Sequence, residues 1–166
     1  MQIKPLVRSL LDWYDKNKRD LPFRSTNDPY KIWLSEIMLQ QTQVSTVIPF
    51  YLNWIKRFPT VESVANADYD KVLKFWEGLG YYRRCFNFHK ASKIILESHN
   101  GQIPSDYQSF INLPGVGDYT AGAVLSIAFN KKIPAIDGNV IRVISRLKKI
   151  KNLTVYNKKI INKTVE

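Results

Sequence analysis

Apolar residues recur along the chain every three or four positions, the spacing that places side chains on one face of a helix. Leu6, Leu10 and Tyr14 form such a series near the start of the chain. The polar, proline-containing segment 16–24 follows, so we predict that the first helix ends near Asn17. Because no stretch alternates apolar and polar residues over the length of a strand, the pattern predicts an all-α fold.

Helix-starting and helix-breaking residues divide the rest of the chain. Asp28 and Pro29 are of the types favoured at the N-cap and the first position of a helix. Pro49 lies inside a helical pattern that runs from 43 to 57, where we expect it in the first turns or at a kink. We predict the remaining helices to start near Val61 and Asp68, to cover 82–98, to flank a turn at 113–117, and to cover 139–149 behind Asp137.

Composition narrows the class of protein. A chain of 166 residues with 45% hydrophobic content can bury one core and is too short for two ordinary domains. Its 25 Lys and Arg residues against 14 Asp and Glu give a net charge of +11, which indicates a polyanionic partner, either nucleic acid or an anionic membrane surface. The alternative is a basic protein that has no such partner.

The sequence argues against a membrane-spanning protein and against a disulfide-stabilised one. The longest apolar stretches, such as 124–129, are much shorter than a membrane span, and the N-terminus has no apolar region followed by a cleavage site. We therefore expect a cytoplasmic protein with no membrane contact. Cys85 is the only cysteine, which excludes an internal disulfide and an all-cysteine metal site built from this chain alone, and we predict no metal ligand.

The turn at 113–117, with the sequence LPGVG, is a candidate anion site. Gly115 and Gly117 permit positive φ and a close approach of the backbone to a ligand. We expect Gly115, Val116 and Gly117 to present free N–H groups at a helix N-terminus, which favours an anion such as a DNA phosphate. The alternative is that the glycines serve only to turn the chain.

Two carboxylates are candidates for catalysis. Glu36 shares a predicted helix with large apolar side chains, including Trp33, and burial there would raise its pKa. Asp137 stands at a helix start, where the helix dipole favours the ionised form. The ordinary alternatives are a partly solvated glutamate and a simple N-cap aspartate.

Four longer motifs carry a family resemblance: PYKIWLSEIMLQQTQV, FWEGLGYYRRCFNFHK, LPGVGDYTAGAVLSIAF and AIDGNVIRVISR. They resemble the adenine DNA glycosylase (MutY-type) branch of the helix-hairpin-helix, endonuclease III-like glycosylases, over roughly residues 7–150. The resemblance implies an all-α glycosylase fold. Residues 1–28 would form an N-terminal helix and connector of the second lobe, 29–136 a six-helix-type lobe with the hairpin at about 107–129, and 137–166 the start of a C-terminal lobe.

The same resemblance implies hydrolysis of the N-glycosidic bond of adenine mispaired with 8-oxoguanine or guanine. Glu36 would protonate the flipped adenine, chiefly at N7, and Asp137 would stabilise the cationic sugar. The chemistry calls for such a pair, because adenine leaves poorly as an anion and an oxocarbenium-like sugar needs a nearby negative charge.

Tyr119 distinguishes this chain from glycosylases that also cut the strand. In those enzymes a nucleophilic lysine stands two residues after the second glycine of the hairpin, the position that Tyr119 takes here. The resemblance therefore implies a monofunctional enzyme in which Tyr119 bonds to the catalytic carboxylates or the sugar region. The alternatives are a plain core aromatic at position 119, an endonuclease III-type pyrimidine glycosylase with lyase activity, and a non-catalytic DNA-binding fragment.

Base flipping requires side chains that fill the gap in the stack. Gln41, Leu79 and Tyr81 match the family positions that enter the stack near the opposing base, and Leu79, flanked by glycines, is expected to be exposed rather than a buried loop anchor. The further candidates are Thr42 for DNA contact and Arg24, Gln40 and Trp33 for the substrate pocket.

The sequence departs from the family pattern after the last motif. Family members normally continue with four cysteines that ligate a 4Fe-4S cluster, and these cysteines are absent here. We therefore expect an incomplete C-terminal lobe and an N-terminal helix whose apolar stripe lacks cover. The expected partner is double-stranded DNA with A:8-oxoguanine or A:G mismatches, bound by a monomer in the nucleoid-containing cytoplasm.

Overall fold

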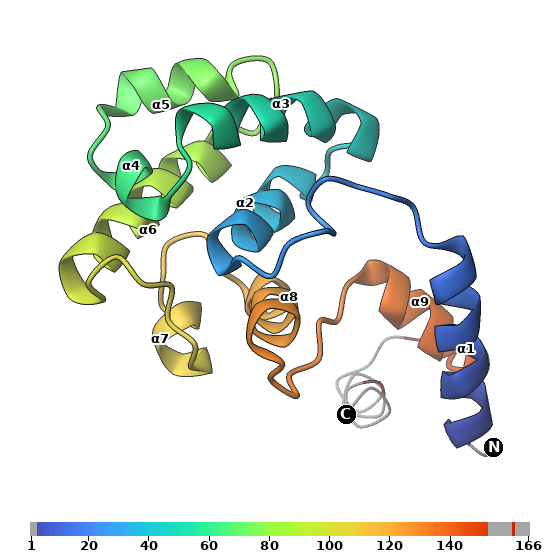
Figure 1. Cartoon of the computed structure of the whole chain (residues 1–166). Coiled ribbons are helices and arrows are strands. Elements are labelled where there is room, and N and C mark those ends of the chain that lie inside the picture. Colours follow the sequence, from blue (N-terminus) through green and yellow to red (C-terminus); the bar gives the residue numbers. More distant parts are fainter. Residues whose placement is uncertain (1–2, 153–160, 162–166) are drawn as a thin grey trace.

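The computed structural model of the chain describes residues 3–152 and 161, and within them every regular element is a helix (Figure 1). The all-α prediction is confirmed. No helix of this described part is long and apolar enough to cross a membrane. The helices are α1 (Ile3–Asn17), α2 (Pro29–Leu39), α3 (Val44–Arg57), α4 (Val61–Ala65), α5 (Tyr69–Trp76), α6 (Arg83–Ser98), α7 (Tyr107–Ile111), α8 (Asp118–Phe129) and α9 (Gly138–Leu147).

Local signals in the sequence account for most helix boundaries. The Asp28 carboxylate accepts a hydrogen bond from the Tyr30 N–H at 2.9 Å, and Pro29 is the first residue of α2, as predicted. The last predicted helix is shorter than expected. It ends at Leu147 because Lys149 adopts a left-handed φ of 56°, which terminates a helix.

Helix α2 lies at the centre of the core, with α3 to α6 on one side and α7 and α8 on the other (Figure 1). Trp33 of α2 packs on Phe88 of α6 with ring centres 4.1 Å apart. The Trp54 indole N–H donates to the Tyr30 hydroxyl at 2.9 Å, and that hydroxyl donates to the Phe58 carbonyl at 2.7 Å. These buried contacts fix α2 on α3, and so fix the side chains that α2 presents to α8.

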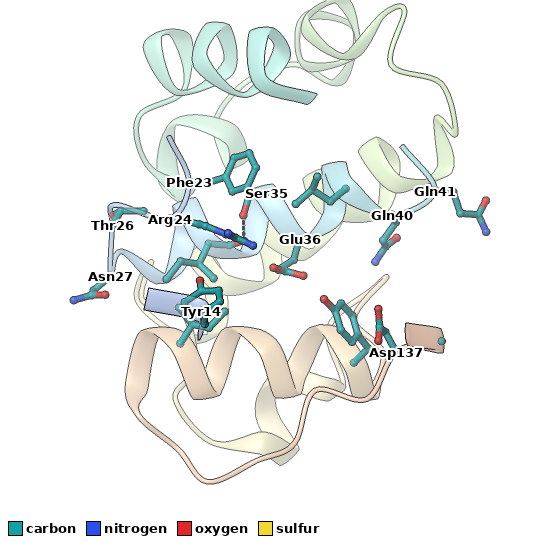
Figure 2. Close-up of a pocket in the computed structure, with 15 residues that line it drawn as sticks. Tyr14, Phe23, Arg24, Thr26, Asn27, Ser35, Glu36, Gln40, Gln41 and Asp137 are labelled. Carbon is teal, nitrogen blue, oxygen red and sulfur yellow. Dashed lines mark hydrogen bonds between the residues drawn. The ribbon is translucent and has the colours of Figure 1, made fainter. Parts of the chain in front are cut away.

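The connector between α8 and α9 returns along α8 to bring Asp137 beside α2 (Figure 2). Asn130 ends α8 in a left-handed conformation, with φ of 53°. The connector then passes so close to α8 that a Cβ atom on Gly122 would lie 2.3 Å from the Pro134 carbonyl oxygen. Only a glycine fits at this crossing, because both sides of the contact are backbone.

Helix α1 exposes its apolar stripe, as the sequence predicts. Leu10 and Trp13 are 60% and 58% exposed, and Leu6 is 42% exposed. The division into lobes at 28 and 136 stays a prediction. Of the expected C-terminal lobe, residues 153–166 other than Ile161 lie outside the described residues.

Candidate active site

A cavity of about 830 Å³ lies between α2 and α8. Figure 2 shows Glu36 extending from α2 into this space and Asp137 pointing into it from the start of α9. The lining residues come from α1, the connector to α2, α2 itself, α8 and the start of α9: Tyr14, Phe23, Arg24, Thr26, Asn27, Ile32, Ser35, Glu36, Leu39, Gln40, Gln41, Tyr119, Ile127, Asp137 and Gly138.

Glu36 is a half-buried carboxyl group whose pKa is raised. Burial is the main cause, since it penalises the charged form, and the negative charge of Asp137 adds a smaller increase. A hydrogen bond with Tyr119 and the positive charge of Arg24 act in the opposite direction without cancelling the increase. Glu36 therefore retains its proton to higher pH than an ordinary glutamate.

Tyr119 of α8 lines the cavity and is hydrogen-bonded to Glu36. Burial raises the pKa of its hydroxyl, and the Glu36 carboxyl raises it further through charge and a hydrogen bond. The phenol therefore stays protonated at neutral pH and can act as a hydrogen-bond donor. The sequence led us to expect such a contact between Tyr119 and a carboxyl group, and the catalytic role of Tyr119 stays a prediction.

Asp137 is the N-cap of α9 and has a lowered pKa. Burial alone would raise that pKa, but hydrogen bonds to the carboxylate outweigh it. One oxygen accepts from the Val140 and Asn139 N–H groups at 2.8 and 3.0 Å, and the other accepts from the Asn139 side-chain amide at 2.8 Å. Asp137 is therefore ionised at neutral pH while it also caps the helix.

The two carboxyl groups thus face one cavity with pKa values shifted in opposite directions. Such a pair can donate a proton to a leaving group on one side and stabilise a developing positive charge on the other. None of the described residues that line the cavity is a lysine, so the lining offers no amine nucleophile for a Schiff base.

Arg24 and Gln40, which the sequence assigned to the substrate pocket, line the cavity, and so does Gln41, which it assigned to DNA contact. Trp33 does not line this cavity, and its assignment to the substrate pocket stays a prediction. Its ring is fully buried against Phe88 and borders a separate internal space of about 40 Å³. Helical periodicity places Trp33 and Glu36 on one helix without saying which neighbour each side chain meets.

The expectation that Leu79 is exposed is also wrong. Its side chain is 5% exposed and packs in the core, because Gly78 and Gly80 adopt φ of 96° and 76° and fold the turn inward. Gln41 and Tyr81 are exposed, and each has a left-handed φ, of 56° and 49°. The assignment of these three residues to DNA contact stays a prediction.

The glycine turn before α8 has the predicted backbone freedom. Gly115 has a φ of 79°, and Gly117 is the N-cap of α8, where it offers no side chain to bond the first amides. The Val116 N–H is not free, since it donates to the Leu113 carbonyl at 3.1 Å. An anion at this turn would therefore meet the amides at the start of α8 rather than the Val116 N–H.

Tyr14 and Arg84 have polar or ring contacts in this region and are not among the predicted site residues. Tyr14 of α1 lines the cavity, and its ring lies 5.7 Å from the Arg24 guanidinium. Arg84 of α6 holds Thr42 through a hydrogen bond of 3.1 Å to its hydroxyl. In the sequence Tyr14 is one position of an apolar stripe and Arg84 one of many basic residues, so no signal distinguishes either.

The residues of this chain do not suit the 4Fe-4S cluster that the family resemblance implies. Cys85 is the only cysteine and is fully buried in the core, where burial raises the pKa of its thiol to about 12. Within the described residues no group of three or more His, Cys, Asp or Glu side chains could hold a metal ion. We assign no role to a cluster in this chain.

Sequence comparison adds independent information. A profile described as "HhH-GPD superfamily base excision DNA repair protein" matches residues 34–165. The adenine DNA glycosylases of Buchnera aphidicola subsp. Baizongia pistaciae (strain Bp) and Rattus norvegicus are 44% and 45% identical over 96% and 86% of this chain. The chain covers 46% and 30% of those two proteins, so it spans less than half of their length.

Structural comparison confirms the endonuclease III-like fold. A thermostable thymine-DNA glycosylase superposes with a TM-score of 0.88 and 28% identity, covering 98% of this chain and 76% of that one. A trapped endonuclease III–DNA covalent intermediate superposes with a TM-score of 0.81 over 98% of this chain and 75% of that one. At 22% identity the second match concerns the fold alone.

Proposed function

Since the chain belongs to the HhH-GPD superfamily of base excision DNA repair proteins, we propose that it is an adenine DNA glycosylase. The single observation that carries the proposal is the pair of Glu36 and Asp137, which face one cavity with pKa values shifted in opposite directions. The two relatives of that name, at 44% and 45% identity, support the choice of adenine over other bases.

Proton donation by Glu36 begins the reaction. The protonated carboxyl group gives its proton to adenine, chiefly at N7, so that the base leaves as a neutral molecule. The C1′–N9 bond breaks and its electron pair stays with adenine, while the sugar becomes oxocarbenium-like. The Tyr119 hydroxyl, bonded to Glu36, orients the acid.

Asp137 stabilises the cationic sugar through its negative charge, which the α9 backbone amides maintain. Water then adds to C1′ and loses a proton to the Glu36 carboxylate, which restores the starting state. With tyrosine at position 119 and no lysine among the lining residues described, the reaction ends at hydrolysis without cutting the strand.

The substrate is duplex DNA with adenine opposite 8-oxoguanine or guanine, bound by one copy of the chain. The net charge of +11 and the uncapped start of α8 support backbone binding. Gln41 lines both the cavity and a neighbouring surface groove that Tyr81 also borders, and Gln41, Thr42 and Tyr81 contact the distorted duplex. Leu79 supports the turn that carries Tyr81 from inside the core. A duplex-DNA substrate implies the compartment that holds the chromosome.

Glu36→Gln tests the proposal, because the amide keeps the size of the side chain and cannot supply the proton. We expect adenine release from an A:8-oxoguanine duplex to fall by at least about a hundredfold under single-turnover conditions, while the Kd for the same duplex stays within a few-fold. Glu62→Gln, an exposed glutamate of α4, is the matched control and should release adenine at the unaltered rate.

Adenine release that persists in Glu36→Gln would remove Glu36 from the mechanism. Borohydride added during the reaction of the unaltered chain should trap no covalent adduct with DNA. A strong adduct would instead assign the chain to the strand-cutting glycosylases.

A further inference from the structure

Arg84, at the start of α6, joins two turns that are far apart in the sequence. One turn follows α2 at 40–42, and the other is the glycine turn at 78–81. The guanidinium is half-buried between them. Nη1 donates to three carbonyls at the end of α2: Ile37 at 3.0 Å, Met38 at 2.8 Å, and Gln40. Nη2 donates to the Thr42 hydroxyl at 3.1 Å. It also donates to two carbonyls of the glycine turn, Gly80 at 3.2 Å and Leu79 at 3.5 Å.

The first set of bonds caps the end of α2 from a different helix. The last carbonyls of a helix lack partners within it, and the helix dipole makes that end favour a cation. Arg84 supplies both the donors and the charge. Since Glu36 lies in the last turn of α2, the same cap holds the helix end that carries the proposed acid.

The second set fixes the glycine turn. The guanidinium carbon lies 5.5 Å from the centre of the Trp76 ring and 5.1 Å from that of the Tyr81 ring. The Trp76 indole N–H donates to the Gly80 carbonyl at 3.0 Å, so Trp76 and Arg84 share that acceptor. The turn is therefore held from the core side by two donors and by stacking.

Each turn presents one exposed side chain from a left-handed residue, Gln41 from the first turn and Tyr81 from the second. Both side chains border the same surface groove of about 390 Å³. A left-handed φ at a residue other than glycine is unfavourable and persists where the surroundings hold it. The bonds from Arg84 to Gln40 and Gly80, the residues just before Gln41 and Tyr81, provide such support.

We propose that Arg84 is a positioning residue for mismatch recognition: one guanidinium holds the two turns together so that Gln41 and Tyr81 meet the duplex as a single rigid edge. The inference rests on the proposed function, because it concerns how that function distinguishes a mismatched duplex from a paired one. Lysine cannot replace arginine here. Its ammonium is a single point with three donors, whereas the planar guanidinium reaches acceptors on both turns.

The test compares Arg84→Lys with Arg83→Lys, each in a chain that also carries Glu36→Gln so that bound DNA is not processed. Both substitutions keep the charge, and Arg83 is an exposed neighbour that serves as the control. The measurement is the ratio of the Kd for a fully paired duplex to the Kd for an A:8-oxoguanine duplex. We expect Arg84→Lys to lower this ratio about tenfold, and Arg83→Lys to leave it unchanged.

The Kd for the paired duplex should stay within about twofold in both variants, because backbone attraction depends on charge. An unchanged ratio in Arg84→Lys would overturn the inference, as would an equal loss of affinity for both duplexes with a lower Tm. If the chain with Arg84 intact shows no preference for the mismatch, the proposed function fails, and the inference fails with it.

A double-mutant cycle keeps the inference testable if Arg84→Lys does not fold. Gln41→Ala and Tyr81→Ala are measured singly and together with Arg84 intact. Because Arg84, and not the other side chain, holds each turn, the inference predicts that the two losses of mismatch preference add. Strongly non-additive losses would show that Gln41 and Tyr81 hold each other in place and would overturn the inference.

Discussion

Glu36 and Asp137 are both carboxylic acids, and the difference between them comes from their immediate partners. Glu36 is buried on the side of α2 and receives little hydrogen-bond compensation beyond Tyr119, so burial keeps its pKa high. Asp137 stands at a helix start and accepts three hydrogen bonds from Asn139 and Val140, which keep its pKa low. Each state follows from the backbone element that carries the residue.

Adenine release should therefore have a bell-shaped pH profile. The rate falls at high pH as Glu36 loses its proton, at a pH above the ordinary glutamate range because its pKa is raised. The rate falls at low pH as Asp137 becomes protonated, at a pH below the ordinary aspartate range because its pKa is lowered. Single-turnover rates across the pH range measure both limbs.

Substitutions of Arg24 test whether Glu36 governs the alkaline limb of this pH profile, since the positive charge of Arg24 lowers the pKa of Glu36. Arg24→Gln should move the alkaline limb to higher pH, and Arg24→Lys, which keeps a charge, should move it less. The acidic limb should not change with either variant. An alkaline limb that stays in place in Arg24→Gln would show that a group other than Glu36 governs it.

The sequence motifs indicated that Glu36, Tyr119 and Asp137 lie together, and the structure brings them together at one cavity. Their catalytic roles stay a prediction. Leu79 turns into the core instead of facing solvent, and Trp33 packs in the core away from the cavity, because glycine content and helix spacing do not specify which partner a side chain packs against. The contacts of Tyr14 and Arg84 are likewise tertiary and have no local signature.

At the scale of elements, the helix boundaries were largely predictable because caps, prolines and glycines act locally. The path of the 131–136 connector was not, since it depends on the contact of Gly122 with Pro134. This contact sets how closely the connector follows α8. It therefore helps to determine where Asp137 lies relative to Glu36.

Gly122→Ala should displace the connector, because its Cβ would lie 2.3 Å from the Pro134 carbonyl oxygen. Overpacking of this kind costs about 1–3 kcal/mol, so we expect a lower Tm. We also expect the single-turnover rate to fall by about tenfold or more, with little change in the Kd for DNA, because the shift moves Asp137 and spares the hairpin.

Ser126→Ala is the control within α8, since it deletes a hydroxyl without adding volume near the connector. It should leave the rate unchanged. A Gly122→Ala protein that is less stable but fully active would mean that Asp137 reaches its place by other contacts.

At the scale of the whole molecule, the excess positive charge is concentrated toward the C-terminal end of the described chain. Residues 131–151 contain these exposed basic side chains: Lys131, Lys132, Arg142, Arg146, Lys148, Lys149 and Lys151. Several of them lie on or beside α9, whose first residue, Gly138, lines the cavity. This arrangement favours a duplex that crosses the hairpin and α9 together.

Charge reversal of Lys148 and Lys149 to Glu should weaken DNA binding and lower the slope of log K against log salt by about 1 for each phosphate that the protein no longer neutralises. The same change at Lys71 and Lys74 of α5, which lies far from α9 in Figure 1, is the control and should have a smaller effect. Titrations at several salt concentrations measure both. An equal effect of the two pairs would place the footprint elsewhere.

The residues that line the cavity are as far apart in the sequence as Tyr14 and Gly138, so the cavity can form only late in folding. Contacts between α7 and α8 are local in sequence and can form early. The cavity is lined from α1, α2, α8 and the start of α9, so its assembly closes long loops and comes late. A partly folded chain would thus acquire its glycine hairpin before its acid–base pair. If the proposed function holds, the capacity to bind DNA would precede the capacity to cleave the glycosidic bond, which needs the last long-range contacts.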